Sequence, residues 1–401
     1  MSSQPWELAW VRALALVGFL ALPLVALPLV ALPLVALPPA AAQDVACVIP
    51  EPIDAPAVSS EVESLRHLAT GAGTTVAVID TGVAPHPQLQ RLTPGADFVT
   101  PEHPNPLHDC DGHGTVVAGI IAGADHGIAP EARIVAIRQT SGHFRFNPED
   151  PGSPGSLASL ADAIHDAVNH NADVINISVV SCVPASARVD DQVLRDALAR
   201  AEDAGAVVVA AAGNESEACP DGSFVYPAHL PTVVAVGARD GAYTLADYSV
   251  SVPDDQVAVS AAGIPHAALS PSGQGYAAGI YPREQSGLEQ FVGTSFAAPV
   301  VSGTVALLHE RFPQDSPAEL RQRLYRAAEP TGGDLDPYQA VSSTGPAQAA
   351  APKAHPAQVQ MAEQPDSFAF RRATWLLTTI GGLLALLVLG IGIRRSYLTS
   401  T

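Results

Sequence analysis

The chain has 401 residues, of which 47% are hydrophobic, and carries a formal net charge of -20. This acidic balance argues against a nucleic-acid-binding protein, which needs basic patches, and fits a protein that stays soluble outside the cytosol. Between apolar segments at its two ends, the chain is long enough for one large α/β domain that needs no metal or disulfide in order to fold.

The N-terminal segment is almost wholly apolar over residues 11–42. Ala40 and Ala42 give the small-x-small pattern of a signal-peptidase site. The motif ALPLV is repeated in tandem over 21–35, and its regularly spaced prolines disfavour a long membrane-spanning helix. We therefore expect a cleaved signal peptide at 1–42 rather than an N-terminal membrane span.

Short β-branched runs alternate with helix-like stretches through the middle of the chain. The runs are continuously apolar, as in parallel strands that are buried on both faces. The alternation predicts a doubly wound α/β domain with a mostly parallel sheet and helices on both faces, whose active site lies at the carboxyl ends of the strands. The predicted strands are 74–80, 133–139, 173–180, 206–213 and 232–238, and the predicted helices are 114–124, 157–171, 189–204, 295–311 and 317–328.

The helix at 317–328 has the clearest start signal. Ser316 is placed as its N-cap, Pro317 at its first position and Glu319 where a capping box requires an acidic side chain. The stretches 141–156 and 264–287, rich in Gly, Pro and Ser, are expected to be loops.

The C-terminal part has two distinct compositions. Residues 331–370 are rich in Pro, Ala and Gln without a period, which predicts a flexible linker. Residues 373–393 form an uncharged apolar run that is long enough to span a bilayer. A buried core helix is the alternative, but the run lies at the end of the chain beyond the linker. The two arginines after it favour a cytoplasmic tail and an extracytoplasmic domain.

The chain has four cysteines, Cys47, Cys110, Cys182 and Cys219. An even number in an exported chain favours disulfides, and the lack of a C-x-x-C pair argues against zinc. Four cysteines allow three pairings, among which the sequence alone does not choose. No acidic cluster stands out as a calcium site, and we expect neither a metal nor a cofactor.

Three polar residues interrupt apolar surroundings. Asp80 ends a predicted buried strand, and taken alone it could be a turn former or a helix cap. His113 lies between glycines at the start of a helix of small residues, where a ligand, a cap or a catalyst would fit. Ser295 also begins a helix and could be an N-cap.

Together the three residues are much more specific. The order Asp, His and then a late Ser in GTS-x-A-x-P differs from the orders of chymotrypsins and α/β-hydrolases. On the motifs VIDTGV, DGHGT and GTSFAAP, residues 65–330 resemble the subtilase family of serine proteases. The resemblance implies that Ser295 is the nucleophile, His113 its general base and Asp80 the residue that orients the imidazole.

The same resemblance identifies the rest of a peptidase site. Asn214, in AAAGN, is expected to donate to the oxyanion, and a turn residue after Gly213 is the alternative. Ser178, Val179 and Val180 match the strand along which the family binds extended peptides. Relatives commonly have Gly where this chain has Val180, so we expect a narrower cleft.

In three features, residues from about 43 to 395 resemble one subfamily of the subtilases, the mycosins. Residues 43–70 are too few for a folded inhibitory propeptide, the segments IRQTSGHF and INISVVSCVP occur with the 141–156 insert, and a Pro-rich linker leads to one apolar helix. Mycosins are attached to type VII (ESX) secretion systems of actinobacteria. The resemblance implies processing of secreted type VII proteins, a structural role in the membrane complex, and the pairings Cys47–Cys110 and Cys182–Cys219.

The expected organisation follows. It comprises a signal peptide at 1–42, an N-terminal extension at 43–64, a peptidase domain at 65–335, a linker at 336–372, a transmembrane helix at 373–393 and a cytoplasmic tail at 394–401. A general exported degradative subtilase and an inactive scaffold subunit remain as alternatives. The first would be expected to lack the anchor, and the intact set of catalytic residues argues against the second.

Overall fold

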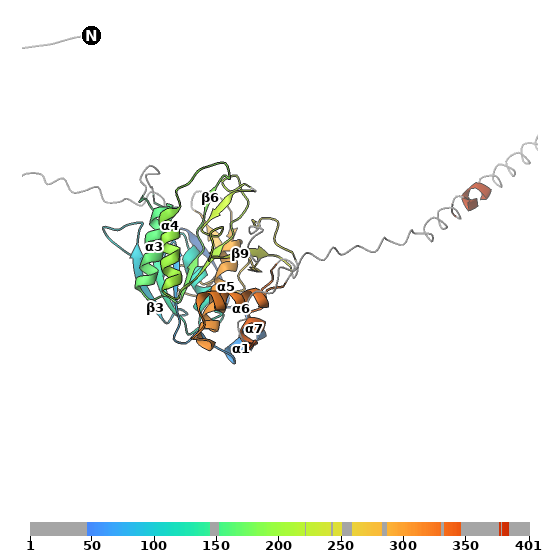
Figure 1. The fold of residues 1–401 in the computed structure, drawn as a ribbon. Coiled ribbons are helices and arrows are strands. Elements are labelled where there is room, and N and C mark those ends of the chain that lie inside the picture. Colours follow the sequence, from blue (N-terminus) through green and yellow to red (C-terminus); the bar gives the residue numbers. More distant parts are fainter. Residues whose placement is uncertain are drawn as a thin grey trace, which may run out of the picture. The chain divides into compact units, whose positions relative to one another are not determined.

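A computed structural model describes most of the chain between the two apolar ends (Figure 1). Residues 1–42, the predicted signal peptide, lie outside the described residues. The described residues are 46–144, 152–220, 222–241, 244–250, 259–282, 287–329, 333–345, 377 and 379–384.

The core of the domain is a seven-stranded sheet in which every neighbouring pair is parallel. The strand order is β10-β9-β7-β5-β2-β4-β3. The five predicted strands are all present, as β2, β4, β5, β7 and β9. The bounds are β2 (Thr75–Asp80), β3 (Leu92–Asp97), β4 (Arg133–Arg138), β5 (Val174–Ile177), β7 (Val207–Ala211), β9 (Val234–Arg239) and β10 (Val259–Ala262).

Helices cover both faces of this sheet. The side chains of Val76 and Val78 share one core with α2 (His113–Ala122), α5 (Thr294–Arg311) and α6 (Pro317–Ala327). Ala77 and Ile79, which point the other way, share a second core with α3 (Leu157–Asn169) and α4 (Gln192–Asp203), and these two helices lie side by side in Figure 1. Two apolar faces explain why the strands are continuously apolar in sequence.

Helix α6 begins as the sequence predicts. The Ser316 hydroxyl accepts from the backbone N–H of Glu319, and the Glu319 carboxylate accepts from the backbone N–H of Ser316 at 2.8 Å. Pro317 occupies the first position. The predicted capping box is therefore confirmed.

A second, antiparallel sheet was not predicted. β1 (Ile49–Ile53) pairs with β11 (Tyr276–Tyr281), which pairs in turn with β12 (Glu289–Gln290). The prediction of a loop over 264–287 was therefore wrong for β11, because its Gly- and Pro-rich surroundings hide a short strand whose partner is far away in sequence. A further pair joins β6 (Ser181–Val183) to β8 (Phe224–Tyr226).

The predicted linker also begins too early. α7 (Pro337–Ser342) lies inside the expected linker at 336–372, and its Ala340 and Val341 are buried in the main core. The domain thus continues past the predicted boundary at 335. A six-residue helix with two apolar positions is too short to show a period in the sequence. The other short helix is α1 (Ser60–Arg66).

The predicted transmembrane segment at 373–393 lies largely outside the described residues. Of its residues, 377 and 379–384 are described, and they are helical. Within the part of the chain that is described, no helix combines the length and apolar character that a membrane crossing requires.

Candidate active site

Asp80 and His113 meet at the carboxyl end of β2, an inner strand of the large sheet. Asp80 is the last residue of β2, and His113 is the first residue of α2. The Nδ1 atom of His113 lies 2.7 Å from Oδ1 of Asp80. The Asp80 side chain is completely buried, whereas 26% of the His113 side chain is exposed. One edge of the imidazole is thus held by a carboxylate, and the ring remains accessible.

The electrostatics around His113 favour its protonated form. Burial lowers the pKa of this imidazole, but the charge and hydrogen bond of Asp80, together with the charges of Asp109 and Asp111, raise it above its usual value. An imidazole with a raised pKa is a stronger base and holds its proton more tightly. The arrangement therefore suits a residue that must accept and then return a proton.

Ser295 lies in the first turn of α5, and its neighbour Phe296 contacts the His113 ring, with 5.1 Å between ring centroids. The Ser295 hydroxyl donates to the carbonyl oxygen of Ser178 at 2.9 Å, and the Ser178 hydroxyl donates back to the carbonyl of Ser295 at 2.9 Å. The Ser295 hydroxyl hydrogen is thus directed at the Ser178 carbonyl.

Asn214 faces the start of α5. Its Oδ1 accepts from the backbone N–H of Thr294 at 3.0 Å and from the Thr294 hydroxyl at 3.1 Å. Because the oxygen is occupied in this way, the amide N–H₂ is left for another acceptor. A Cβ on Gly293 would lie 2.8 Å from Nδ2, so only glycine leaves room for this amide.

The predicted substrate-binding residues follow β5 directly. Ser178 is buried and bonded to Ser295, Val179 is half-buried, and Val180 is 36% exposed. Asn176, inside β5, donates from Nδ2 to the Ser178 hydroxyl at 2.9 Å. The structure thus places the segment beside Ser295, with Val180 at the surface.

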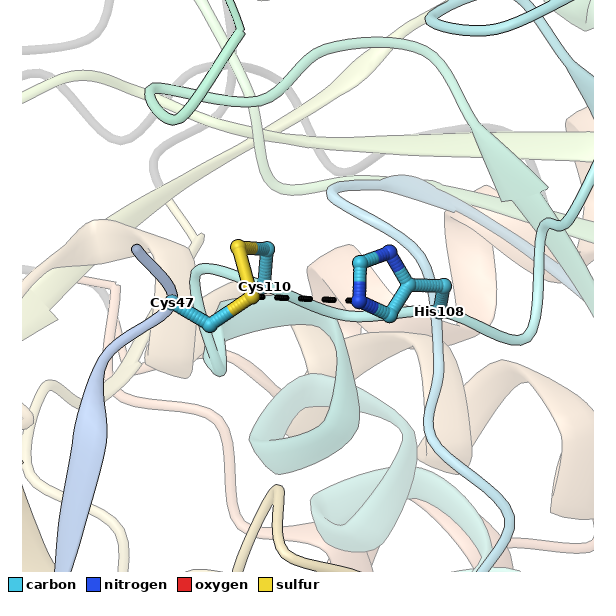
Figure 2. A group of neighbouring side chains, drawn as sticks. All are labelled: Cys47, His108 and Cys110. Atoms are coloured by element: carbon cyan, nitrogen blue, oxygen red, sulfur yellow. Dashed lines mark hydrogen bonds between the residues drawn. A yellow bond between two sulfur atoms is a disulfide. The ribbon is translucent and has the colours of Figure 1, made fainter. Parts of the chain in front are cut away.

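Two disulfides are present, Cys47–Cys110 and Cys182–Cys219. The first joins the N-terminal segment to the loop before His113, and the backbone N–H of Val48 also donates to the Cys110 carbonyl at 3.0 Å. Figure 2 shows His108 beside this bond, with Nε2 at 3.8 Å from Cys47 Sγ. The three residues have the spacing of a metal site, but sulfurs bonded to each other are not thiolate ligands.

The sequence reading missed several residues that touch this site. Thr81 lies inside the VIDTGV motif and bonds to Asp109, two residues before DGHGT. Ser302 in α5 bonds to Asn176 in β5. Nothing in the sequence singles them out, because a buried Asp, Asn or Ser becomes informative only when its partner is known.

Known proteins resemble both the sequence and the fold. The profile of the Subtilase family matches residues 71–356. Mycosin-4 of Mycobacterium tuberculosis is 38% identical over 331 residues, which cover 75% of this chain and 71% of that protein. The solved structure of the MycP3 protease from the type VII (ESX-3) secretion system has a TM-score of 0.66 at 34% identity and covers 75% of this chain and 93% of its own.

A further structure is a chain in the periplasmic assembly from the ESX-5 inner membrane complex. It has a TM-score of 0.66 at 29% identity, over 78% of this chain and 91% of that one. The chain described above therefore belongs to the subtilase family of serine endopeptidases and, within it, to the mycosins.

Proposed function

We propose that this chain is an endopeptidase of a type VII secretion system that processes secreted proteins, with Asp80, His113 and Ser295 as its catalytic triad. The observation that carries the proposal is the 2.7 Å contact between His113 Nδ1 and the buried Asp80 carboxylate, at the sheet edge where α5 begins. A peptidase needs this pair because a serine hydroxyl is a weak nucleophile without an adjacent base.

The reaction then follows the acyl-enzyme route. Ser295 Oγ attacks the scissile carbonyl while His113 Nε2 takes its proton. Asp80 holds the Nδ1–H edge and stabilises the imidazolium. His113 returns the proton to the leaving amine, and a water then attacks the acyl-enzyme by the same steps.

The oxyanion of the tetrahedral intermediate needs two donors. Asn214 Nδ2 is suited to be one, because Thr294 occupies only the oxygen end of its amide. The backbone N–H of Ser295 is suited to be the other, since it lies in the first turn of α5, where N–H groups lack intrahelical acceptors. Donors already in place cost no reorganisation during the reaction.

The proposed location is the outer side of the cell membrane. A cleaved signal at 1–42, an anchor at 373–393 and a cytoplasmic tail at 394–401 would put the peptidase domain outside. The similarity to a chain of the ESX-5 periplasmic assembly supports this orientation. A reporter enzyme fused after Thr401 should be active only in the cytoplasm, and a reporter active outside the membrane would contradict the anchor.

A structural role in the secretion complex is a second candidate function, favoured by the same similarity to an assembled subunit. It is compatible with proteolysis. A general degradative subtilase has less support, because the similar MycP3 protease belongs to a type VII (ESX-3) secretion system.

One experiment separates these functions. The full chain and its Ser295→Ala variant are expressed in native membranes, with Ser343→Ala, an exposed serine on the last turn after α7, as the control. We expect Ser295→Ala to stop processing of the secreted proteins while the chain still co-purifies with the membrane complex. Normal processing by Ser295→Ala would refute the protease, and failure of the unmodified chain to co-purify would refute the type VII role.

A further inference from the structure

Asp109 is a buried carboxylate that the catalytic steps above do not use. Asp109 is 8% exposed, and among the described residues its carboxylate forms no ion pair with a basic side chain. Instead it accepts four hydrogen bonds from neutral groups. A buried anion without a counter-charge is costly, so its donors must be well placed to keep it ionised.

Three of the four bonds lie on the two sides of His113. Oδ1 accepts from the backbone N–H of Gly112 at 2.9 Å. Oδ2 accepts from the backbone N–H of Thr115 at 2.8 Å and from its hydroxyl at 2.6 Å. One side chain thus closes the turn that carries the imidazole. Gly112 has φ of 74°, a left-handed conformation that glycine adopts readily.

The fourth bond reaches the partner of His113. The Thr81 hydroxyl donates to Asp109 Oδ1 at 2.8 Å and lies 3.3 Å from Asp80 Oδ1. A hydroxyl has one hydrogen, and the shorter contact takes it. The Thr81 hydroxyl oxygen also accepts from the backbone N–H of Gly114 at 3.1 Å. Asp109 therefore draws the Thr81 proton away from Asp80.

The consequence concerns the charge of Asp80. Its Oδ1 accepts from His113 and from the Thr81 backbone N–H at 2.8 Å, and its Oδ2 is buried with no hydrogen-bond partner among the described residues. With the Thr81 hydroxyl held elsewhere, the negative charge of Asp80 stays available to the imidazolium.

We infer that Asp109 is a positioning residue for the reaction, acting on His113 through the 109–115 turn and on Asp80 through the Thr81 hydroxyl. The inference rests on the proposed roles of Asp80 and His113. The ionisable groups that face His113 are Asp80, Asp109 and Asp111. Burial raises the pKa of Asp109 to about 6, although its hydrogen bonds from Thr115 and Thr81 act to lower it.

The test uses the full chain and a fluorophosphonate probe, which forms a bond from phosphorus to Ser295 Oγ and releases fluoride. The probe needs an activated serine but no knowledge of the natural substrate. Its limiting rate and its half-saturating concentration are measured against pH for Asp109→Asn, with Asp111→Asn as the control. Both changes remove one negative charge near His113, but the Asp111 carboxylate accepts from Ser141 and Gly142, whereas the Gly112 and Thr115 N–H groups donate to Asp109.

We expect Asp109→Asn to lower the limiting rate by about ten- to a hundredfold, the scale of a small misplacement of a catalytic group. The half-saturating concentration should stay unchanged. The acid limb should move to lower pH, because a charge that raises the pKa of His113 is gone. Asp111→Asn should move the limb in the same direction and keep the limiting rate within about threefold.

A second pair of variants covers the case in which Asp109→Asn does not fold. Thr81→Val removes the bridging hydroxyl at nearly constant shape, and Thr81→Ser restores it. We expect the first to be slow and the second close to the unmodified chain. Unchanged limiting rates per folded molecule in both Asp109→Asn and Thr81→Val would overturn the inference. Labelling of Ser295→Ala would instead refute the proposed nucleophile, so the two failures are distinguishable.

Discussion

The hydroxyl of Ser302, two turns into α5, donates to Oδ1 of Asn176 in β5 at 2.8 Å. The Nδ2 atom of Asn176 in turn donates to the Ser178 hydroxyl, which donates to the carbonyl of Ser295. A chain of hydrogen bonds thus ties the helix that carries the proposed nucleophile, Ser295, to the segment proposed to bind substrate.

Breaking this chain should cost stability. Ser302→Ala leaves the buried Oδ1 of Asn176 without its donor, and we expect the free energy of unfolding to fall by about 1–3 kcal/mol. Thermal unfolding should show a lower Tm than that of Ser343→Ala, an exposed serine changed in the same way. Equal Tm values for the two variants would mean that the hydrogen bond between Ser302 and Asn176 does not stabilise the domain.

Replacing Asp80 should change both the rate and its pH dependence. Asp80→Asn removes the charge that contributes most to raising the pKa of His113, so this pKa should fall and the acid limb of kcat/KM should move to lower pH. The plateau should drop roughly 10⁴-fold, since the imidazole loses its orienting carboxylate. A pH–rate series on a peptide substrate checks both effects. An acid limb that stays in place would show that Asp80 does not set the basicity of His113.

The role of Asn214 can be separated from its contact with Thr294. Asn214→Asp keeps an acceptor for the Thr294 N–H but replaces the donor with an oxygen. We expect kcat to fall by about 10²–10³, the loss typical of one oxyanion donor, with little change in KM. Asn169→Ala, at an exposed position at the end of α3, is the control. If Asn214→Asp turned over as fast as this control, the amide would not be an oxyanion donor.

The Cys47–Cys110 disulfide should stabilise the domain because it restricts the unfolded chain, and its two cysteines are 63 residues apart in sequence. The chain-entropy description gives about 4 kcal/mol as an upper figure. The double variant Cys47→Ser, Cys110→Ser avoids a stray thiol. It should unfold at lower temperature and lose its N-terminal segment to added protease sooner, although β1 keeps its pairing with β11.

Peptide mapping without reductant provides the complementary check on the unmodified chain. It should recover Cys47 linked to Cys110 and Cys182 linked to Cys219. A peptide that joins Cys47 to Cys182 or Cys219, or a free Cys47 thiol, would contradict this account of the N-terminal segment.

Several parts of the molecule were determined by local sequence. The strand that ends at Asp80 and the helices that begin at His113 and Thr294 follow from runs of buried residues and their boundaries, which neighbouring residues along the chain specify. The α6 capping box is equally local, since Ser316 and Glu319 are three positions apart. The candidate triad was recognisable for the same reason, because each of its members lies within one short motif.

Tertiary structure decided the features that depend on partners distant in sequence. β1 is a strand because β11 lies beside it, and α7 is part of the domain because Ala340 and Val341 enter its core. Four cysteines permit three pairings, and the fold selects one by bringing the Cα atoms of Cys47 and Cys110 to 4.5 Å. Asp109 looks like any loop carboxylate until the fold buries it and surrounds it with four donors. Burial and hydrogen-bond partners are properties of the assembled chain, and no local pattern encodes them.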